Sequence, residues 1–487
     1  MSKDFVKEAT RAFALDLIRE GKLTVDEAEA KFDIQLKENL SLKYGSYADD
    51  FIVHDKRGKP QLQNVELAEY IVNEIGFFSC KRYDYIYGGK KWNCYDDDNL
   101  TLALIDNLTK SRCSNFQLQD ALKTLRVRAT IIEAELLSMR RDSAGMVNFK
   151  NCVFNIRTGE RLVHNRSFFL EHILDFDYDS LAVCPKFQSF VARGLQEDQQ
   201  QIQTFYEFIG YILEGGKPWW QAALILKGDA NSGKSSALDL IEMICGDDNC
   251  SRIGLDELDD KFTAHQFAGK ICNIADEVPD DPIDAQKFKR IIAGNKISAQ
   301  DKGKPIYKLE PTVRFVIAAN DLLRFRKADN LESLVKRQLY LNWDAPLTKD
   351  NQNWKIVDEL REELPGIFNV VFGAHQILKA RGKFLTPDAT IALLNEFERE
   401  QDSSIEFLDE AVVPTENSMD MISFTLIYEK YVTHCKIVHR GVLGKQKFYR
   451  KMRKWVTKKG SPLSAVMYGN REVMQCAQLF SEVKPKT

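Results

Sequence analysis

Short apolar runs, each closed by a polar segment, dominate the middle of the chain. Residues 222–227 read Ala-Ala-Leu-Ile-Leu-Lys without Pro or Gly, and residues 270–275 and 312–319 form similar runs. Apolar runs of this length are typical of buried strands in a parallel sheet. Between them, residues 236–245 and 281–293 carry apolar positions at helical spacing. This alternation predicts an α/β domain built on a central parallel sheet.

Helical periodicity predominates toward the N-terminus. Residues 101–145 are helical and charged, residues 46–100 have a mixed pattern, and residues 1–45 contain an apolar stripe followed by a capping-box pattern. The stripe consists of Phe13, Ala14, Leu17 and Ile18, and the capping box of Thr24 and Glu27. We therefore expect a mainly helical N-terminal domain over residues 1–145 that serves assembly or DNA contact.

The C-terminal pattern is a helix over residues 424–436, a basic helix over 445–458 and a hairpin over 465–474. This order is typical of a winged helix, whose second helix suits a major groove, although a solvated basic helix is the alternative. The basic helix carries no acid; its candidate DNA contacts are Lys445, Lys447, Arg450, Lys451, Lys454 and Lys458. The expected division is 1–145, 146–215 (leader or collar), 216–385 (α/β core), 386–420 (linker) and 421–487 (C-terminal winged-helix domain).

Composition narrows the classes of protein that need to be considered. The chain has 487 residues and a formal net charge of −3, so any nucleic-acid site must be local. Its ten cysteines form no C-x-x-C pair and no ligand-spaced cluster with the seven histidines, which favours reduced thiols over a zinc site or a disulfide framework. The N-terminus lacks a signal-peptide core, and no apolar run reaches the ~20 residues of a membrane span. We expect a cytoplasmic protein that makes no contact with membranes.

The segment from Gly228 to Ser235 reads G-x-x-x-x-G-K-S between a predicted strand and a predicted helix, the setting of a nucleotide-binding P-loop. In such a loop Lys234 supplies a charge to the β- and γ-phosphates of ATP and Ser235 offers a hydroxyl to Mg²⁺. The alternative is a chance match in a surface loop. The expected nucleotide-binding residues are Gly228, Asp229, Ala230, Asn231, Ser232, Gly233, Lys234, Ser235 and Ser236.

Two further apolar strands end on polar side chains that suit ATP hydrolysis. Asp276 and Glu277 follow residues 270–275, as in a Walker B element, where the first acid serves Mg²⁺ and the second polarises the attacking water. A surface turn is the alternative. Asn320 ends the strand 312–319 and could sense the γ-phosphate or orient the water. Downstream, Arg324, Arg326, Lys336 and Arg337 are cations, and one arginine placed across a subunit boundary would serve as a finger.

Three other segments are weaker candidates. A predicted hairpin over residues 296–309 carries Lys302 and Lys304 at its tip, which suits either a phosphate backbone or an ordinary solvated turn. Aromatic residues stand near cations over residues 81–92, a pattern that can stack bases but more often marks a half-buried hairpin. The acids at 96–98 lack spaced partners and are interpreted as a solvated turn rather than a metal site.

The order of these motifs resembles superfamily 3 helicases, AAA+ proteins of viruses, phages and plasmids that form hexameric rings. Flanking segments resemble the leader of the poxvirus primase-helicase and phage/plasmid primase C-terminal group; these segments are 151–155, 158–159, 184–187 and 210–213. The resemblance covers roughly residues 145–455. The resemblance implies that Lys302 and Lys304 lie on a DNA-tracking hairpin, that Asn320 is sensor 1 and that Arg337 is the arginine finger.

The chain departs from that group at two motifs. Ser232 precedes the Gly-Lys pair where Asn is usual, and Val335-Lys336-Arg337 stands where a doubled arginine is frequent, so Arg324 and Arg326 remain alternatives for the finger. Residues 1–145 show no spaced acidic triad and are too few for a primase-polymerase module, so priming activity is not expected.

These observations predict an ATP- and Mg²⁺-dependent hexameric DNA helicase that initiates replication of a phage or other mobile element in a bacterial cytoplasm. Its partners would be single-stranded DNA in the ring channel, origin duplex at the C-terminal domain, further copies of the chain and host replication proteins. Two alternatives remain open. One is a DNA-stimulated P-loop ATPase that remodels DNA or protein without unwinding, and the other is a DNA-binding regulator switched by nucleotide.

Overall fold

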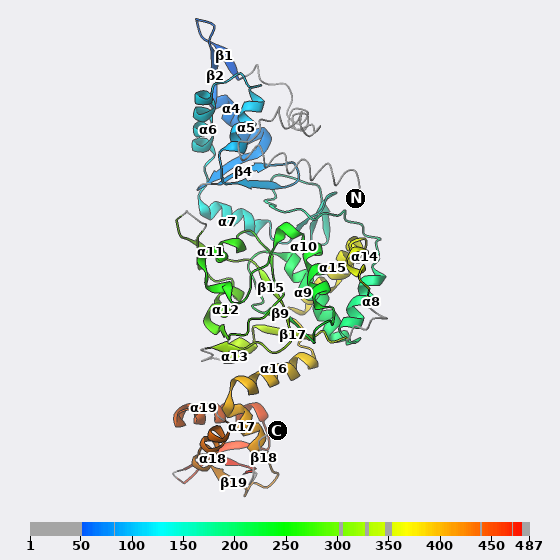
Figure 1. Ribbon diagram of the computed structural model, residues 1–487, viewed down its shortest axis with the longest axis vertical. Coiled ribbons are helices and arrows are strands. Elements are labelled where there is room, and N and C mark those ends of the chain that lie inside the picture. Colours follow the sequence, from blue (N-terminus) through cyan, green and yellow to red (C-terminus); the bar gives the residue numbers. More distant parts are fainter. Residues whose placement is uncertain are drawn as a thin grey trace. The chain divides into compact units, whose positions relative to one another are not determined.

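The computed structural model describes residues 51–81, 83–300, 305–326, 331–345, 353–438, 441–469 and 471–479 (Figure 1). The helices expected within residues 1–45 lie outside this part of the chain. The chain divides into two compact units, Met1–Tyr178 and Asp179–Thr487. Among the described residues, no helix has the length and apolar character needed to cross a membrane.

The first unit combines helices with small antiparallel sheets. Its strands form the pair β1–β2 and the three-stranded sheets β3–β4–β5 and β6–β7–β8. Its main helix, α6, begins with a capping box formed by Ser114 and Gln117, which the sequence analysis did not predict. The elements are β1 (Ile52–His54), β2 (Pro60–Leu62), α4 (Asn64–Tyr70), a π-helical turn (Ile71–Gly76), β3 (Phe77–Cys80), β4 (Tyr83–Tyr87), β5 (Trp92–Tyr95), α5 (Asn99–Leu108), α6 (Asn115–Ala129), α7 (Glu133–Asp142), β6 (Met146–Asn148), β7 (Val153–Asn155) and β8 (Glu160–Leu162).

The predicted parallel sheet is confirmed in the second unit. It consists of β9 (Ala223–Lys227), β10 (Cys250–Ser251), β11 (Cys272–Ala275), β15 (Arg314–Ala319) and β17 (Gln338–Asn342). The spatial order is β10-β11-β15-β9-β17, and every neighbouring pair is parallel. The strands are almost entirely buried, which explains why their sequences are continuously apolar rather than alternating.

Helices cover this sheet. Helix α10 packs against β11 and β15, α9 packs against α15 and β17, and α16 packs against β17. The helices are α8 (Pro185–Gly194), α9 (Gln199–Glu214), α10 (Lys234–Cys245), α11 (Lys261–Ala264), α12 (Ala285–Ile292), α13 (Leu331–Val335), α14 (Ile356–Arg361), α15 (Leu364–Arg381) and α16 (Asp388–Gln401). Two short strand pairs accompany them, β12 (Ile283–Asp284) with β16 (Phe325–Arg326) and β13 (Ile297–Ala299) with β14 (Tyr307–Leu309).

Trp343, directly after β17, anchors the sheet to the helices before it. Its side chain is fully buried, and its ring lies 5.5 Å from that of Phe190 and 5.3 Å from that of Phe205. The ring also lies against Gly194, so closely that a Cβ at that glycine would overlap it. The close approach of α8 to the sheet therefore depends on a glycine at position 194.

The C-terminal elements pack around a core of their own that includes Phe407, Tyr431, Phe448 and Met452. The two predicted helices and the hairpin are confirmed, with Tyr468 opposite Arg471 beside the turn. The elements are α17 (Ser403–Ala411), β18 (Val412–Pro414), β19 (Met421–Ser423), α18 (Phe424–Ile437), α19 (Lys445–Lys459), β20 (Ser464–Tyr468), β21 (Arg471–Gln475) and β22 (Ala477–Leu479).

Two expected divisions of the chain differ from the structure. Residues 386–420, expected as a linker, contain α16 and α17, because Phe397 joins the core beside the parallel sheet and Phe407 joins the C-terminal core. Strands β6–β8, expected in a leader with α8 and α9, belong to the first compact unit. Short polar stretches such as 401–404 look like linkers in sequence, yet here Asp402 caps α17.

Candidate active site

The strand topology gathers the candidate hydrolytic residues at one edge of the sheet. Because all five strands are parallel, their carboxyl ends meet at the same edge, where open α/β sheets bind their ligands. The loop 228–233 follows β9, Asp276 and Glu277 follow β11, and Asn320 follows β15. Since β15 lies between β9 and β11, Asn320 extends between the loop and the acids.

The loop after β9 has the backbone shape that its glycines predict. Asn231 and Gly233 adopt positive φ angles of 63° and 90°, and α10 begins at Lys234 directly after the left-handed Gly233. Gly228 lies against the backbone of Trp343, and a Cβ there would overlap the carbonyl oxygen of Trp343. The loop is thus held between β9 and the end of β17 in a conformation that requires glycine.

Lys234 stands at the first position of α10 and folds back over the loop. Its Nζ donates hydrogen bonds to the carbonyl oxygens of Gly228 and Asp229, each at 2.7 Å. Burial lowers the pKa of Lys234, while the nearby carboxylates of Asp229 and Asp344 act in the opposite direction. A partly desolvated cation at the N-terminus of a 12-residue helix is an arrangement that suits phosphate.

Replacing Gly228 by Ala is expected to destabilise the protein by about 1–3 kcal/mol, because the new Cβ must displace rigid backbone at Trp343. Gly373 in α15 is the matched control, since it is exposed and its added Cβ would meet nothing within 4 Å. Gly373→Ala is expected to stabilise the protein by about 0.5–1 kcal/mol, as Ala does inside helices. Urea unfolding of both variants measures the difference, and equal midpoints would refute the packing argument.

The two acids after β11 are exposed, and one of them is held in place. Asp276 Oδ2 accepts a hydrogen bond from Arg252 Nη1 at 3.0 Å. Arg252 follows β10 and also contacts Asp239 and Glu242 on α10. The sequence analysis missed Arg252, because no motif marks it and its neighbours are fixed only by the strand order.

Asp344, after β17, is a second residue that the sequence analysis missed. Its Oδ1 accepts a hydrogen bond from the backbone N–H of Asp229 at 3.2 Å, so a carboxylate contacts the backbone of the loop 228–233. The only sequence signal is its place directly after an apolar strand. Because β17 is parallel to β9, the residue that follows β17 lies at the same sheet edge as the loop that follows β9.

Arg337 lies at the other end of the sheet. Its carbonyl oxygen accepts a hydrogen bond from the N–H of Ala223, at the start of β9. Its guanidinium donates to the carbonyl of Ser333 at 2.8 Å and to Gln221 Oε1 at 3.1 Å, and burial lowers the pKa of Arg337. Five residues at ~3.3 Å each separate it from the loop by roughly 16 Å. Arg337 therefore does not join the site of its own chain. The alternatives are exposed: Arg324 directly precedes β16, and Arg326 is its last residue.

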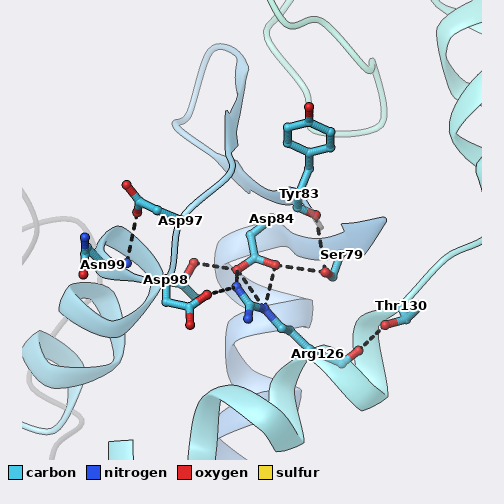
Figure 2. Close-up of polar contacts among 9 residues, drawn as sticks. Ser79, Tyr83, Asp84, Asp97, Asp98, Asn99, Arg126 and Thr130 are labelled. Carbon is cyan, nitrogen blue, oxygen red and sulfur yellow. Dashed lines mark hydrogen bonds and ion pairs between the residues drawn. The ribbon is translucent and has the colours of Figure 1, made fainter. Parts of the chain in front are cut away.

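Asp98, one of the acids at 96–98, belongs to a structural network in the first unit (Figure 2). The buried carboxylate of Asp84 accepts hydrogen bonds from Ser79 and Thr101, each at 2.9 Å, and a bidentate pair from Arg126, Nε to Oδ1 and Nη2 to Oδ2. Asp98 pairs with the same guanidinium at 2.7 Å. Asp97 accepts a hydrogen bond from the N–H of Asn99. Within the described residues, no group of three or more His, Cys, Asp or Glu side chains is arranged to hold a metal ion.

The aromatic residues between 83 and 92 are mainly core residues. Tyr85 and Trp92 are 2% and 6% exposed and pack with Phe78 and Phe169. The half-buried hairpin interpretation is confirmed by the antiparallel pairing of β4 with β5. Tyr85 and Trp92 therefore have no free face on which a base could stack.

The basic helix α19 differs from its expected character. The sequence shows no acid in this helix, but acids from other elements pair with it: Lys451 with Asp402, Lys458 with Glu398, Lys459 with Asp409 and Arg453 with Glu472. The expectation of uncompensated cations is thus wrong, because α16, α17 and β21 supply the counter-charges. Arg450 is exposed, and exposed Lys445 lies over the ring of Tyr449.

The hairpin β13–β14 is confirmed, whereas its tip, with Lys302 and Lys304, lies outside the described residues. None of the ten cysteines is disulfide-bonded. Cys250 and Cys272 lie opposite each other in neighbouring strands.

Two protein families match parts of the chain. Residues 67–196 match the family described as "D5 N terminal like", and residues 226–337 match a family of unknown function, DUF5906. Among solved structures, the A-form apo structure of the NrS-1 C-terminal region is similar at 12% identity and a TM-score of 0.50, covering 85% of this chain and 99% of that one. Another apo structure of the same region gives a TM-score of 0.49 at 12% identity, with the same coverage. At 12% identity the likeness to the NrS-1 C-terminal region shows a shared fold, and the D5 N terminal-like match is limited to residues 67–196.

Proposed function

We propose that the protein is an ATP-dependent DNA helicase that initiates replication of a phage or other mobile element. The observation that carries this proposal is the sheet edge at which the P-loop, Asn320 and the Asp276–Glu277 pair converge. The superfamily 3 AAA+ assignment accounts for all of these elements in one arrangement. The proposed place of action is the cytoplasm of a bacterial host.

The residues at this edge fit ATP and Mg²⁺. Positive φ angles at Asn231 and Gly233 and the start of α10 give the loop a concave backbone of the kind that binds phosphate through N–H groups. Lys234 would hold the β- and γ-phosphates, while Ser235 and Asp276 would hold Mg²⁺. Bound Mg²⁺–ATP supplies the phosphoryl group and the charge that polarises it. Glu277 would accept a proton from water, and Asn320 would orient that water.

A ring of identical subunits, with six as the expected number, would complete the site. A finger arginine supplied by a neighbouring subunit stabilises charge on the transferred phosphoryl group. Arg337 is the proposed finger because it is placed far from the P-loop of its own chain. Arg324 and Arg326 are the alternatives.

DNA contacts are proposed at two places. Lys302 and Lys304 would contact single-stranded DNA in the ring channel. The order α17, β19, α18, α19, β20, β21 suits a winged helix, in which α19 would enter the major groove of origin duplex. Lys445 and Lys447 at its start would reach bases, while Arg450 and Lys454 would contact phosphates. Lys451 and Lys458 are better explained as parts of the domain's own ion pairs.

The decisive experiment measures ATP turnover and fork unwinding with and without single-stranded DNA. Wild-type protein is expected to hydrolyse ATP and to unwind a fork. Lys234→Ala protein is expected to remain folded but to show neither ATP turnover nor unwinding. DNA-stimulated turnover without unwinding would favour the remodelling ATPase. ATP binding without DNA-stimulated turnover would favour the nucleotide-switched regulator.

Arg450 and Lys451 are neighbours in sequence with opposite expected roles. Arg450→Gln should reduce the log–log salt slope of duplex binding by about 0.9, as expected for one lost phosphate contact. Lys451→Gln should keep the slope but destabilise the domain by about 1–3 kcal/mol, because Asp402 is buried and loses its partner. Salt titrations and urea unfolding of both variants test this assignment. If Lys451→Gln reduced the salt slope of duplex binding and Arg450→Gln left it unchanged, the two assignments would be reversed.

A further inference from the structure

Arg252 connects three carboxylates from two sides of the candidate site. Its Nη1 lies 3.0 Å from Asp276 Oδ2, at the end of β11. Its Nη2 lies 3.1 Å from Asp239 Oδ1 and 2.6 Å from Glu242 Oε2, both on α10. Nε adds a hydrogen bond to Glu242 Oε1 at 3.2 Å. One guanidinium thus bridges the acid strand and the helix that begins at Lys234.

The arrangement uses the geometry that is specific to arginine. Its planar fork binds Glu242 through two nitrogen atoms and still directs the third at Asp276. A lysine would offer a single charged nitrogen that cannot span the same positions. A guanidinium stays charged at any physiological pH, so the bridge keeps its charge.

The ion pairs of Arg252 contribute little to the stability of the fold. The Arg252 side chain is 40% exposed and that of Asp276 is 55% exposed. Ion pairs this exposed contribute little to folding, because water and salt screen their attraction. Without the arginine, however, Asp239, Glu242 and Asp276 would repel one another, and Asp276 would turn away from α10.

We infer that Arg252 is a positioning residue that ties Asp276 to α10 and thereby sets the proposed Mg²⁺ site. Ser235, the other proposed residue for Mg²⁺, lies in the first turn of the same helix, so the bridge makes both residues parts of one unit. A carboxylate accepts about four hydrogen bonds, so pairing with Arg252 through Oδ2 is compatible with a role toward hydrated Mg²⁺. This inference rests on the proposed function.

The test compares nucleotide affinity with and without Mg²⁺ in Arg252→Gln, using a fluorescent ATP analogue. In EDTA the affinity should stay within about twofold of wild type, because Lys234 and the loop are unchanged. The gain in affinity on adding Mg²⁺ should fall by about 10- to 100-fold, the usual effect of losing a residue that orients a metal ligand. The Mg²⁺ concentration for half-maximal ATP turnover should rise by a similar factor. Arg252→Lys should restore part of the gain.

Two further variants separate positioning from general damage. Lys186→Gln, which removes an exposed ion pair with Glu359 in the same unit, is the matched control and should behave as wild type. The double change Asp239→Asn with Glu242→Gln keeps the ion pair between Arg252 and Asp276. It removes the two ion pairs that join Arg252 to α10. It should reduce the Mg²⁺-dependent gain in the same direction as Arg252→Gln, and it carries the test if Arg252→Gln does not fold.

The outcomes distinguish this inference from the proposed function. Wild-type protein that binds no nucleotide would overturn the proposed function and, with it, the role of Arg252. Wild-type protein with a normal Mg²⁺-dependent gain, matched by an equal gain in Arg252→Gln, would overturn the inference alone. Equal losses of affinity with and without Mg²⁺ would also overturn it, because they would indicate a disturbed loop rather than a misplaced Asp276.

Discussion

Glu277→Gln protein is expected to bind Mg²⁺–ATP normally and to hydrolyse it about 10²–10⁴-fold more slowly than wild type, the usual contribution of a general base. Gln keeps the size of the side chain but cannot accept the proton of the attacking water. Asp276 and its bond to Arg252 remain, so the proposed metal site is preserved. Single-turnover hydrolysis and equilibrium nucleotide binding separate the two effects.

Asp281→Asn is the control for this experiment, because Asp281 is an exposed acid a few residues farther along the same segment. It should hydrolyse ATP at the wild-type rate. Turnover by Glu277→Gln within about tenfold of wild type would show that another group activates the water, since loss of a general base costs at least 10². The assignment of the Asp276–Glu277 pair would then be wrong.

Arg337→Ala is expected to lower ATP turnover by about 10³–10⁵-fold, the contribution of an arginine finger. The defect should be repaired in mixed rings. Arg337→Ala subunits keep an intact P-loop, and Lys234→Ala subunits keep an intact arginine. An interface between one of each therefore contains a complete site. Mixing two inactive proteins should restore part of the activity.

The contacts of Arg337 within its own chain call for a control in this experiment. Arg337 also bonds to Ser333 and Gln221, so its loss can loosen the start of β17. Arg337→Lys tests this point, because it keeps a cation but loses the fork. Rings must be verified by mass at each mixing ratio. Failure of every ratio with Arg337→Ala, together with recovery by Arg324→Ala or Arg326→Ala, would move the finger to an exposed arginine beside β16.

Features that depend on local sequence were predictable, and those that depend on strand order were not. The loop 228–233 and the acids after β11 were recognisable as candidates because a glycine pattern and an apolar run stand next to them in sequence. The insertion of β15 between β9 and β11 follows from packing across the whole sheet. Arg252 and Asp344 become neighbours of the site only through that order, so neither could be found from the sequence.

The basic helix α19 illustrates the same limit for charge. Its cations cluster between Lys445 and Lys459, but the acids that pair with Lys451, Lys458 and Lys459 lie about fifty to sixty positions earlier. A local count of charges therefore indicated a free basic surface where folding supplies counter-ions. Similarly, Tyr85 and Trp92 resembled stacking residues, because alternation along a strand does not reveal that both faces are covered.

Trp343 has a consequence for how this sequence can change during evolution. Its ring fills the space beside Gly194, while its backbone carbonyl fills the space beside Gly228. A larger residue at 194 is tolerated only together with a smaller one at 343, so these two positions must covary. No substitution at 343 can compensate for a larger residue at 228, because every amino acid at 343 carries the same carbonyl oxygen. Substitution at 228 therefore lowers stability whatever residue stands at 343, whereas positions 194 and 343 can change together.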